Sequence, residues 1–419
     1  MSMPPASPVA PHPSMPAARI VLILSLLLGL QPITTDLYLP SLPGLTAELH
    51  ATLAQAQLTL SALLLAFGLS QLVWGPLSDR YGRRPILLGG LAAYVAASVL
   101  STLAPSMDAL ILARIVQGAA MGAAVMAARA IVRDLYRPTE GARVMSKGLT
   151  GLGVIACASG PLGGLLAGTA GWRAALLALA VFGAATLAVV LWRFEETLRQ
   201  RNPQALQPAT LLRTWAQILR HPTFWAWSSL AAASYGGLFT MLAASSFVFI
   251  QVLGLSRPAY GLLMSTVSGT YIVGTLLCRR LLPRWGVRRT VAVAAGFTLS
   301  GGLLLGVFAY AGLHSGWAIM LPFYLYMLAH GVHQPCSQSG AVGPFPYAAG
   351  AASALNGFAM MVAAFATGSW LGVAMDGTAR PLALALLASG LACLVLVLWS
   401  EKGKLFGPSD AEMGMKGVP

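Results

Sequence analysis

Long apolar runs separated by short polar turns dominate the sequence. A helix needs about 20 apolar residues to cross a hydrocarbon core of about 30 Å, and twelve runs of that kind can be counted. Only 9% of the residues are charged, against roughly 25% in a soluble domain. The expected fold is an all-α polytopic membrane protein with twelve transmembrane helices. The predicted spans are 20–42, 57–77, 86–104, 108–133, 145–168, 173–193, 223–250, 259–282, 289–311, 316–338, 350–374 and 380–399.

The longest polar interruption divides these runs six and six, and it is expected to contain a short interfacial helix at about 209–220. The first residues, rich in Pro, Ser and Ala, predict a disordered tail. The predicted organisation is this tail at 1–18, an N-terminal six-helix bundle at 19–193, a cytoplasmic linker at 194–221, a C-terminal six-helix bundle at 222–400 and a cytoplasmic tail at 401–419.

An internal repeat supports the division into two pseudo-symmetric bundles. A shift of 204 positions superimposes two loops, with Arg80 on Arg284, Tyr81 on Trp285, Gly82 on Gly286 and Arg84 on Arg288. The same shift aligns Asp79 with Pro283 in the second loop, so a function that needs the acid is confined to the first half of the chain.

The basic residues indicate how the chain is oriented. Of 26 Lys and Arg, three are expected on the external side (Arg173, Arg257, Arg380) and two within the membrane (Arg114, Arg129). The rest fall on one side, which the tendency of Lys and Arg to stay inside makes the cytoplasmic side. Both termini are then cytoplasmic. The same bias explains the net charge of +14, and we expect no nucleic-acid partner.

The turn from Gly75 to Pro85 places an acid and three arginines between two apolar runs. Gly75 and Gly82 are expected to let helix ends and turn approach closely, and Asp79 can cap a helix or pair with an arginine. The whole turn could therefore act as a charge-relay latch. The alternative is that its arginines only fix the topology: Arg80, Arg83 and Arg84.

Two charged residues lie inside apolar runs. Asp36 is the only acid clearly within the hydrocarbon zone, and Arg114 stands six residues from Asp108 at the outer face. At 1.5 Å per residue Asp36 is about 25 Å beyond Arg19, so both charges belong to the outer half of the membrane. We expect them to pair, with Asp36 carrying a proton whose pKa the arginine lowers. The alternative is a salt bridge that only packs two helices.

The Gly75–Pro85 string resembles the loop signature of the major facilitator superfamily, between its second and third helices. Residues 32–43, with Thr-Asp-Leu-Tyr-Leu-Pro, resemble the first helix of the bicyclomycin-resistance (Bcr/CflA) branch of drug:proton antiporters. Arg114-x-x-Gln-Gly, Val-Arg133-Asp134 and residues 345–355 are also similar to that branch. The resemblance implies two bundles that rock about a central cavity, and conformational roles for Arg133 and Asp134. Departures from the branch lie mainly in the middle of runs seven and ten, the part of the chain that is expected to face the substrate.

Run five carries Gly160, Pro161 and Gly164. The small residues predict tight helix contact, and Pro161 predicts a bend. In the superfamily this pattern is similar to the antiporter motif of exporters, which implies export. Simple close packing is the alternative.

Candidate substrate-binding residues are polar or bulky groups within apolar runs: Tyr38, Gln71, Tyr235, Phe239, Met241, His330, His333 and Asn356. The histidine pair is more simply explained by hydrogen bonds between helices, and most of the aromatic side chains by contact with lipid or neighbouring helices. The four cysteines lack metal-ligand spacing, so we expect no metal and no cofactor.

The leading interpretation is a proton-coupled multidrug exporter in the bacterial inner membrane, working by alternating access. Its substrates would be lipophilic molecules, neutral or singly charged, because the membrane zone holds a single acid. Its other partners would be protons and lipids, and it would be a monomer. A specific metabolite carrier, such as a nucleoside exporter, is the alternative on the same fold. A membrane enzyme or sensor is disfavoured, because the sequence has no nucleotide-binding loop and no catalytic set.

Overall fold

The computed structural model describes residues 15–136, 138–198, 200–313, 315–345 and 348–402. Most of the predicted tails and residues 346–347 of the motif at 345–355 fall outside these ranges. Every element within the described residues is a helix. In chain order they are α1 (Ala17–Asp36), η1 (Leu39–Ser41), α2 (Leu42–Glu48), α3 (Leu53–Tyr81), α4 (Arg83–Thr102), α5 (Met107–Leu135), α6 (Pro138–Thr169), α7 (Trp172–Arg193), α8 (Pro208–Leu219), α9 (Pro222–Ser246), η2 (Phe247–Val252), α10 (Arg257–Tyr310), α11 (Gly316–Val342), α12 (Ala349–Ala374) and α13 (Arg380–Lys402).

Ten helical segments of the described residues are long and apolar enough to cross a membrane. One of them, α10, covers two of the predicted runs, 259–282 and 289–311. Gly286 lies between these runs with non-helical dihedral angles, so α10 consists of two helices joined at a kink. The predicted tenth run corresponds to α11, which is not among the ten because its tyrosines and histidines lower its hydropathy. The short helix expected near 209–220 is present as α8.

The predicted span 20–42 lies within one membrane-length segment, Ala17–Glu48, but this segment is not one continuous helix. The run at 20–42 is divided, because α1 ends at Asp36 and the chain continues through η1 into α2. Pro40 and Pro43 have no backbone N–H to continue a helical ladder, which explains the interruption.

The two loops that the 204-residue shift aligns have the same backbone form. Gly82 ends α3 with φ 112° and ψ 159°, and Gly286 breaks α10 with φ 69° and ψ 170°. A positive φ with extended ψ strongly favours glycine. The N-caps that open these two helices, Thr52 and Ser256, also differ by 204 positions. The backbone therefore repeats the correspondence seen in the sequence.

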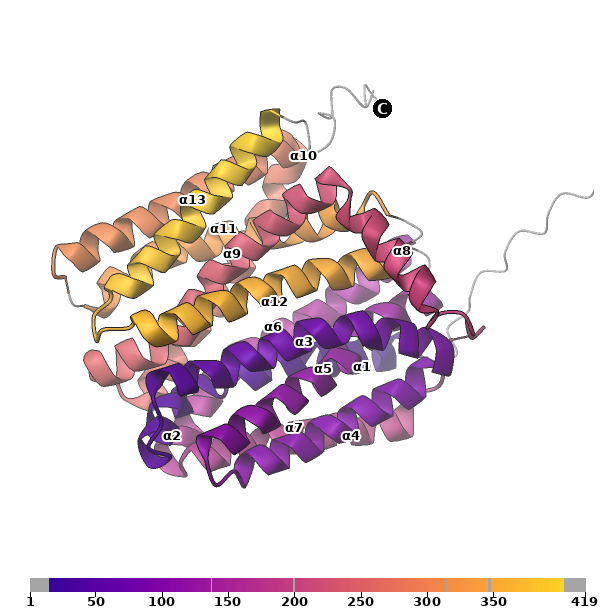
Figure 1. The fold of residues 1–419 in the computed structure, drawn as a ribbon, viewed down its shortest axis with the longest axis horizontal. Coiled ribbons are helices and arrows are strands. Elements are labelled where there is room, and N and C mark those ends of the chain that lie inside the picture. The colour runs from indigo at the N-terminus through magenta and orange to yellow at the C-terminus, as the bar shows by residue number, and fades with distance from the viewer. Residues whose placement is uncertain (1–14, 137, 199, 314, 346–347, 403–419) are drawn as a thin grey trace, which may run out of the picture.

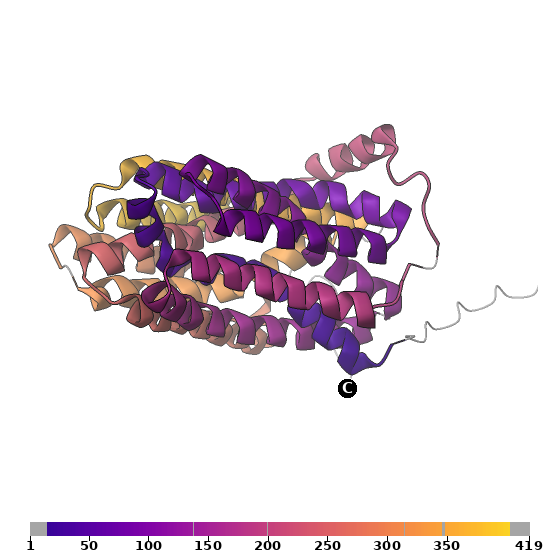
Figure 2. The same cartoon turned by 90° about the horizontal axis from the view of Figure 1, so that it is seen from below.

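The helices lie side by side in an elongated body (Figure 1). Helices α1 to α7 gather on one side and α9 to α13 on the other, and the seam between them is formed mainly by α3 with α12 and by α6 with α10. Helix α8 is set off at one end, opposite α2 (Figure 2). We call these the α8 end and the α2 end.

Candidate functional site

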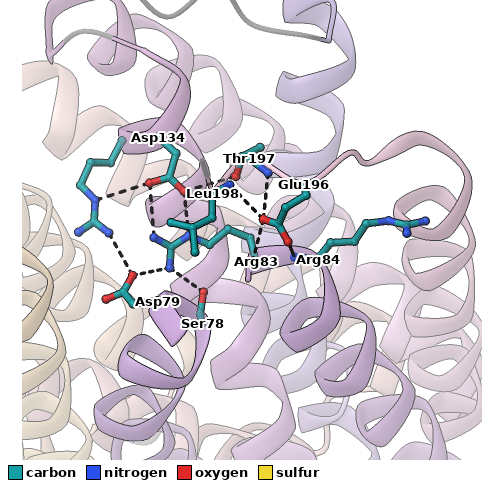
Figure 3. Close-up of polar contacts among 9 residues, drawn as sticks. Ser78, Asp79, Arg83, Arg84, Asp134, Glu196, Thr197 and Leu198 are labelled. Carbon is teal, nitrogen blue, oxygen red and sulfur yellow. Dashed lines mark hydrogen bonds and ion pairs between the residues drawn. The ribbon is translucent and has the colours of Figure 1, made fainter. Parts of the chain in front are cut away.

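An ion-pair cluster at the α8 end joins α3, α4 and α5 (Figure 3). The Arg83 side chain is 1% exposed, pairs with Asp79 Oδ1 at 2.6 Å and Asp134 Oδ2 at 2.8 Å, and donates to Ser78 Oγ at 2.7 Å. Arg133 lies 3.7 Å from Asp79 Oδ1. A buried guanidinium with two carboxylates and a hydroxyl is well compensated. The cluster therefore ties the start of α4 to the ends of α3 and α5.

Glu196, which no sequence motif marked, completes this region from the linker after α7. Its carboxylate accepts four backbone N–H groups, and α4 has no side-chain cap of its own. Oε1 accepts from Arg83 at 2.9 Å, Thr197 at 3.0 Å and Leu198 at 3.0 Å, and Oε2 accepts from Arg84 at 3.1 Å. A carboxylate at a helix N-terminus also interacts favourably with the helix dipole. The only signal for it in the sequence is an acid that follows an apolar run.

Three other residues of the Gly75–Pro85 turn, Gly75, Arg80 and Gly82, take no part in the ion pairs of the cluster. Gly82 has φ 112°, which favours glycine, and a Cβ there would lie 2.5 Å from Glu196 Oε2 and would displace the carboxylate that caps α4. The expected close approach at Gly75 is wrong, since no atom lies within 4 Å of the position a Cβ would take. Arg80 is exposed and lies over the Tyr81 ring at 5.5 Å, outside the ion-pair cluster.

Arg114 is completely buried between α5 and α1. It donates to Gln117 Oε1 at 2.6 Å and to the Thr34 carbonyl at 3.0 Å, and its guanidinium lies 4.3 Å from the Tyr38 ring centroid. Tyr38 in turn donates to Thr59 Oγ1 at 2.9 Å. A ring face, a carbonyl and an amide thus compensate the buried cation in place of a carboxylate.

The expected pairing of Asp36 with Arg114 is wrong in this structure. Asp36 accepts from Thr35 Oγ1 at 2.9 Å, and no ion pair joins the two charges. Arg114 instead meets the carbonyl of Thr34 near the end of α1 and the ring of Tyr38, which follows that helix. Positions two apart on a helix differ by about 200° around its axis, so Asp36 points the other way.

Asp36 faces the seam between the two sides of the molecule. It is half-buried and lies near Cys157 on α6, Tyr235 on α9 and Tyr260 on α10. One turn earlier on α1, Gln31 Nε2 donates to the hydroxyl of Tyr235 at 3.4 Å. These two residues are 204 positions apart, so they are equivalent positions of the sequence repeat that meet across the seam. A pseudo-twofold axis through this point would bring them together.

The eight candidate substrate residues are all buried in this conformation. Tyr38 lies under Arg114, with its ring centroid 4.3 Å from the guanidinium. Gln71 on α3 lies 3.6 Å from the Cβ position of Gly357 on α12, and Asn356 donates to Gln338 Oε1 at 2.9 Å. Phe239 and Met241 on α9 are 1% exposed. Binding of a compound by these residues stays a prediction.

The histidine pair on α11 bonds to α9. Ser234 Oγ lies 2.9 Å from Nδ1 of His330 and 3.4 Å from Nδ1 of His333. The ring of His330 also contacts Tyr235 and Tyr271, with centroids 6.3 and 5.8 Å apart. The contacts with Ser234 are hydrogen bonds between two helices, the simpler of the two explanations for the histidine pair.

Helix α6 meets α10 through its glycines, as expected. A Cβ on Gly160 would lie 2.7 Å from the Gly261 carbonyl oxygen, and a Cβ on Gly164 would overlap the carbonyl oxygen of Arg257. The Arg257 guanidinium donates to the Ala167 carbonyl at 2.6 Å, across the seam. Pro161 lies inside α6. The two sides of the molecule are therefore in tight contact toward the α2 end.

Among the described residues, no group of three or more His, Cys, Asp or Glu could hold a metal ion. The four cysteines are free thiols, with Sγ of Cys278 and Cys336 3.8 Å apart. The candidate site is thus built from ion pairs, amides and aromatic rings.

Comparison with known proteins identifies the family of this chain. The family model of the Major Facilitator Superfamily matches residues 24–368. The chain belongs to the major facilitator superfamily. Members of this superfamily are transporters, so the protein is a multi-pass membrane transporter and not an enzyme.

Its relatives point to one branch of the superfamily. The chain is 31% identical over 344 residues to a chloramphenicol resistance protein of Pseudomonas aeruginosa, which covers 81% of this chain and 80% of the relative. It is 26% identical to a bicyclomycin resistance protein homolog of Haemophilus influenzae, over 90% of this chain and 93% of the relative. The resemblance to the bicyclomycin-resistance branch is confirmed. The solved inward-open structure of the Escherichia coli xylose transporter XylE has the same fold, with a TM-score of 0.72 at 16% identity, over 94% of this chain and 97% of that one.

Proposed function

We propose that this transporter exports small drug-like molecules from the bacterial cytoplasm in exchange for protons. The names of the relatives, resistance proteins for chloramphenicol and bicyclomycin, support drug efflux. The observation that carries proton coupling is Asp36, an acid within a membrane-spanning helix that is half-buried at the seam and has no ion-pair partner among the described residues. Such a carboxyl group can take up and release a proton as its surroundings change.

The proposed architecture is two pseudo-symmetric six-helix bundles, twelve transmembrane helices in all, with bundles at 19–193 and 222–400 joined by the linker 194–221. The positive φ and extended ψ common to Gly82 and Gly286 support it, as does the break of α10 into two spans. The contact between Gln31 and Tyr235, equivalent positions of the repeat, supports a twofold axis at the seam.

Alternating access would act at the two ends of this seam. Toward the α2 end, the packing of Gly160 and Gly164 on α10 and the bond from Arg257 to Ala167 hold the sides together. Toward the α8 end, a side-chain hydrogen bond from Arg129 to Ser353 crosses the seam at 2.9 Å. We propose that the α2 end is the external gate, sealed here, and that the ion-pair cluster around Arg83 positions the α8 end.

The proposed location is the bacterial inner membrane, with the α8 end and both termini cytoplasmic. Arginines gather at the α8 end in the cluster and in the Gly286 turn, which is the side where Lys and Arg accumulate. A monomer in contact with lipid and with protons suffices for this mechanism.

The proposed substrates are lipophilic molecules, neutral or singly charged. Asp36 is an acid inside a described span, away from the helix ends that hold Asp108 and Asp134, and Tyr235, Phe239 and Met241 could provide apolar and aromatic contacts. The bundles would have to separate for these side chains to meet a compound, because they are buried now.

Transport of a chemically varied panel into inverted vesicles tests the proposal. Uptake of several lipophilic drugs that rises when the vesicle interior is acidified is the expected result. Uptake that ignores the pH gradient would argue for a facilitator. Transport of one metabolite and no drug would favour the specific-carrier alternative.

A further inference from the structure

A groove of about 360 Å³ opens at the α8 end, where the starts of α1 and α4 meet the end of α7. Its lining comes from all three helices and the residues after α7: Arg19, Arg84, Leu191, Trp192, Arg193, Phe194, Glu195 and Glu196. It is separate from the ion-pair cluster, since the Arg84 side chain extends away from Asp79 and Asp134 (Figure 3). None of the proposed transport steps uses it.

Three guanidinium groups from three helices converge on this groove. Arg84 is held in place, because its Nε donates to the Phe194 carbonyl and one Nη to the Leu191 carbonyl, both at 3.0 Å. A guanidinium has five N–H donors, so three remain on Arg84 for a ligand. Arg19 is half-buried and Arg193 is exposed. A fixed arginine flanked by two others is a favourable arrangement for a phosphate group.

The acids of the groove do not cancel this charge. Both oxygens of Glu196 are engaged by four backbone N–H groups at the start of α4 and in the linker. The groove thus holds two carboxylates against three arginines, and no ion pair joins Glu195 or Glu196 to those arginines among the described residues. The groove therefore keeps an excess of positive charge.

The apolar part of the groove belongs to the membrane boundary. Leu191 and Trp192, in the last turn of the spanning helix α7, are 47% and 78% exposed. Tryptophan favours the headgroup level of a bilayer, where an indole can contact both acyl chains and water. Basic pockets between helices at this level are suited to anionic lipid headgroups.

We propose that this groove binds an anionic phospholipid, with its phosphate on Arg19, Arg84 and Arg193 and its acyl chains along Leu191 and Trp192. Inorganic phosphate would satisfy the arginines but would leave the exposed leucine and indole without a partner. The lipid fits both parts, and its binding would fix the junction of α1, α4 and α7.

Native mass spectrometry of delipidated full-length protein in detergent tests this site. Dioleoyl phosphatidylglycerol should bind, and phosphatidylcholine should bind at least tenfold more weakly. Each arginine near an anionic headgroup contributes about fivefold in affinity, so the double variant Arg19→Gln/Arg193→Gln should lose about 25-fold. The matched control Arg284→Gln/Arg289→Gln removes the same charge from the Gly286 turn and should change affinity less than twofold.

Three results would overturn the proposal. The groove variant could retain phosphatidylglycerol as well as the control does, phosphatidylcholine could bind equally well, or millimolar inorganic phosphate could displace the lipid completely. The double lysine variant Arg19→Lys/Arg193→Lys, which keeps the charge, should restore most of the affinity. That rescue separates loss of the site from loss of the fold, and thermal unfolding of each variant provides an independent check.

Discussion

Replacing Glu196 by alanine should destabilise the junction of α3, α4 and α7. The carboxylate serves four backbone N–H groups, and α4 begins at Gly82 without any other side-chain cap. Loss of a single cap typically costs about 1 kcal/mol. Four amides would cost more, but Glu196 is exposed and water can replace part of the loss. We expect Glu196→Ala to lower the free energy of unfolding by about 2 kcal/mol.

Two further variants sharpen this prediction. In Glu196→Gln the amide oxygen can keep the three bonds of Oε1, while the amide nitrogen faces the N–H of Arg84, so the loss should be intermediate. Glu195→Ala is the matched control, because its exposed side chain makes no hydrogen bond or ion pair with any described residue. Its free energy of unfolding should change by less than about 0.5 kcal/mol.

Unfolding by SDS in mixed micelles gives the free energy, and hydrogen exchange gives the location. The backbone amides of residues 83, 84, 197 and 198 should exchange faster in Glu196→Ala than in Glu195→Ala. The reasoning would be refuted if the two alanine variants had equal stability and equal exchange at these four amides.

Other predictions concern the buried cation and the seam. Arg114→Lys should lower the free energy of unfolding by about 2 kcal/mol in the same assay. An ammonium cannot bond both Gln117 Oε1 and the Thr34 carbonyl and also cover the Tyr38 ring. Unchanged stability would contradict this geometry. Gly164→Ala should weaken closure at the α2 end by about 1–3 kcal/mol, because its Cβ would overlap the carbonyl oxygen of Arg257. Labelling of a cysteine introduced at the α2 end should then be faster, whereas Gly153→Ala, whose Cβ would meet only one side-chain atom at 3.8 Å, should not change it. Equal labelling in the two alanine variants would count against a gate at this contact.

The helical fold could be predicted from the sequence because apolar run length is a direct consequence of bilayer thickness. The break in α10 was predictable too, since Gly286 repeats Gly82 in the sequence and both glycines have a positive φ. The division of the first span was not, although Pro40 and Pro43 were visible, because proline allows a kink, a break or a new helix start.

The candidate site was predictable in its charges and not in its contacts. Arg83 and Asp134 were recognised by their motifs, but Glu196 has no motif, because its role depends on where the linker returns. The depths of Asp36 and Arg114 could be estimated from the rise of a helix. The face of α1 that meets Arg114 could not, because helix rotation is set by the packing of neighbouring helices.

The central claim is that Asp36 couples protons to export, and drug uptake by inverted vesicles carrying Asp36→Asn tests it most directly. The account predicts that an imposed pH gradient drives uptake by the wild type and not by the variant. Exchange of external for internal drug without a gradient should persist in the variant, which shows that it is folded and binds substrate. Gradient-driven uptake by Asp36→Asn at the wild-type rate would contradict the account.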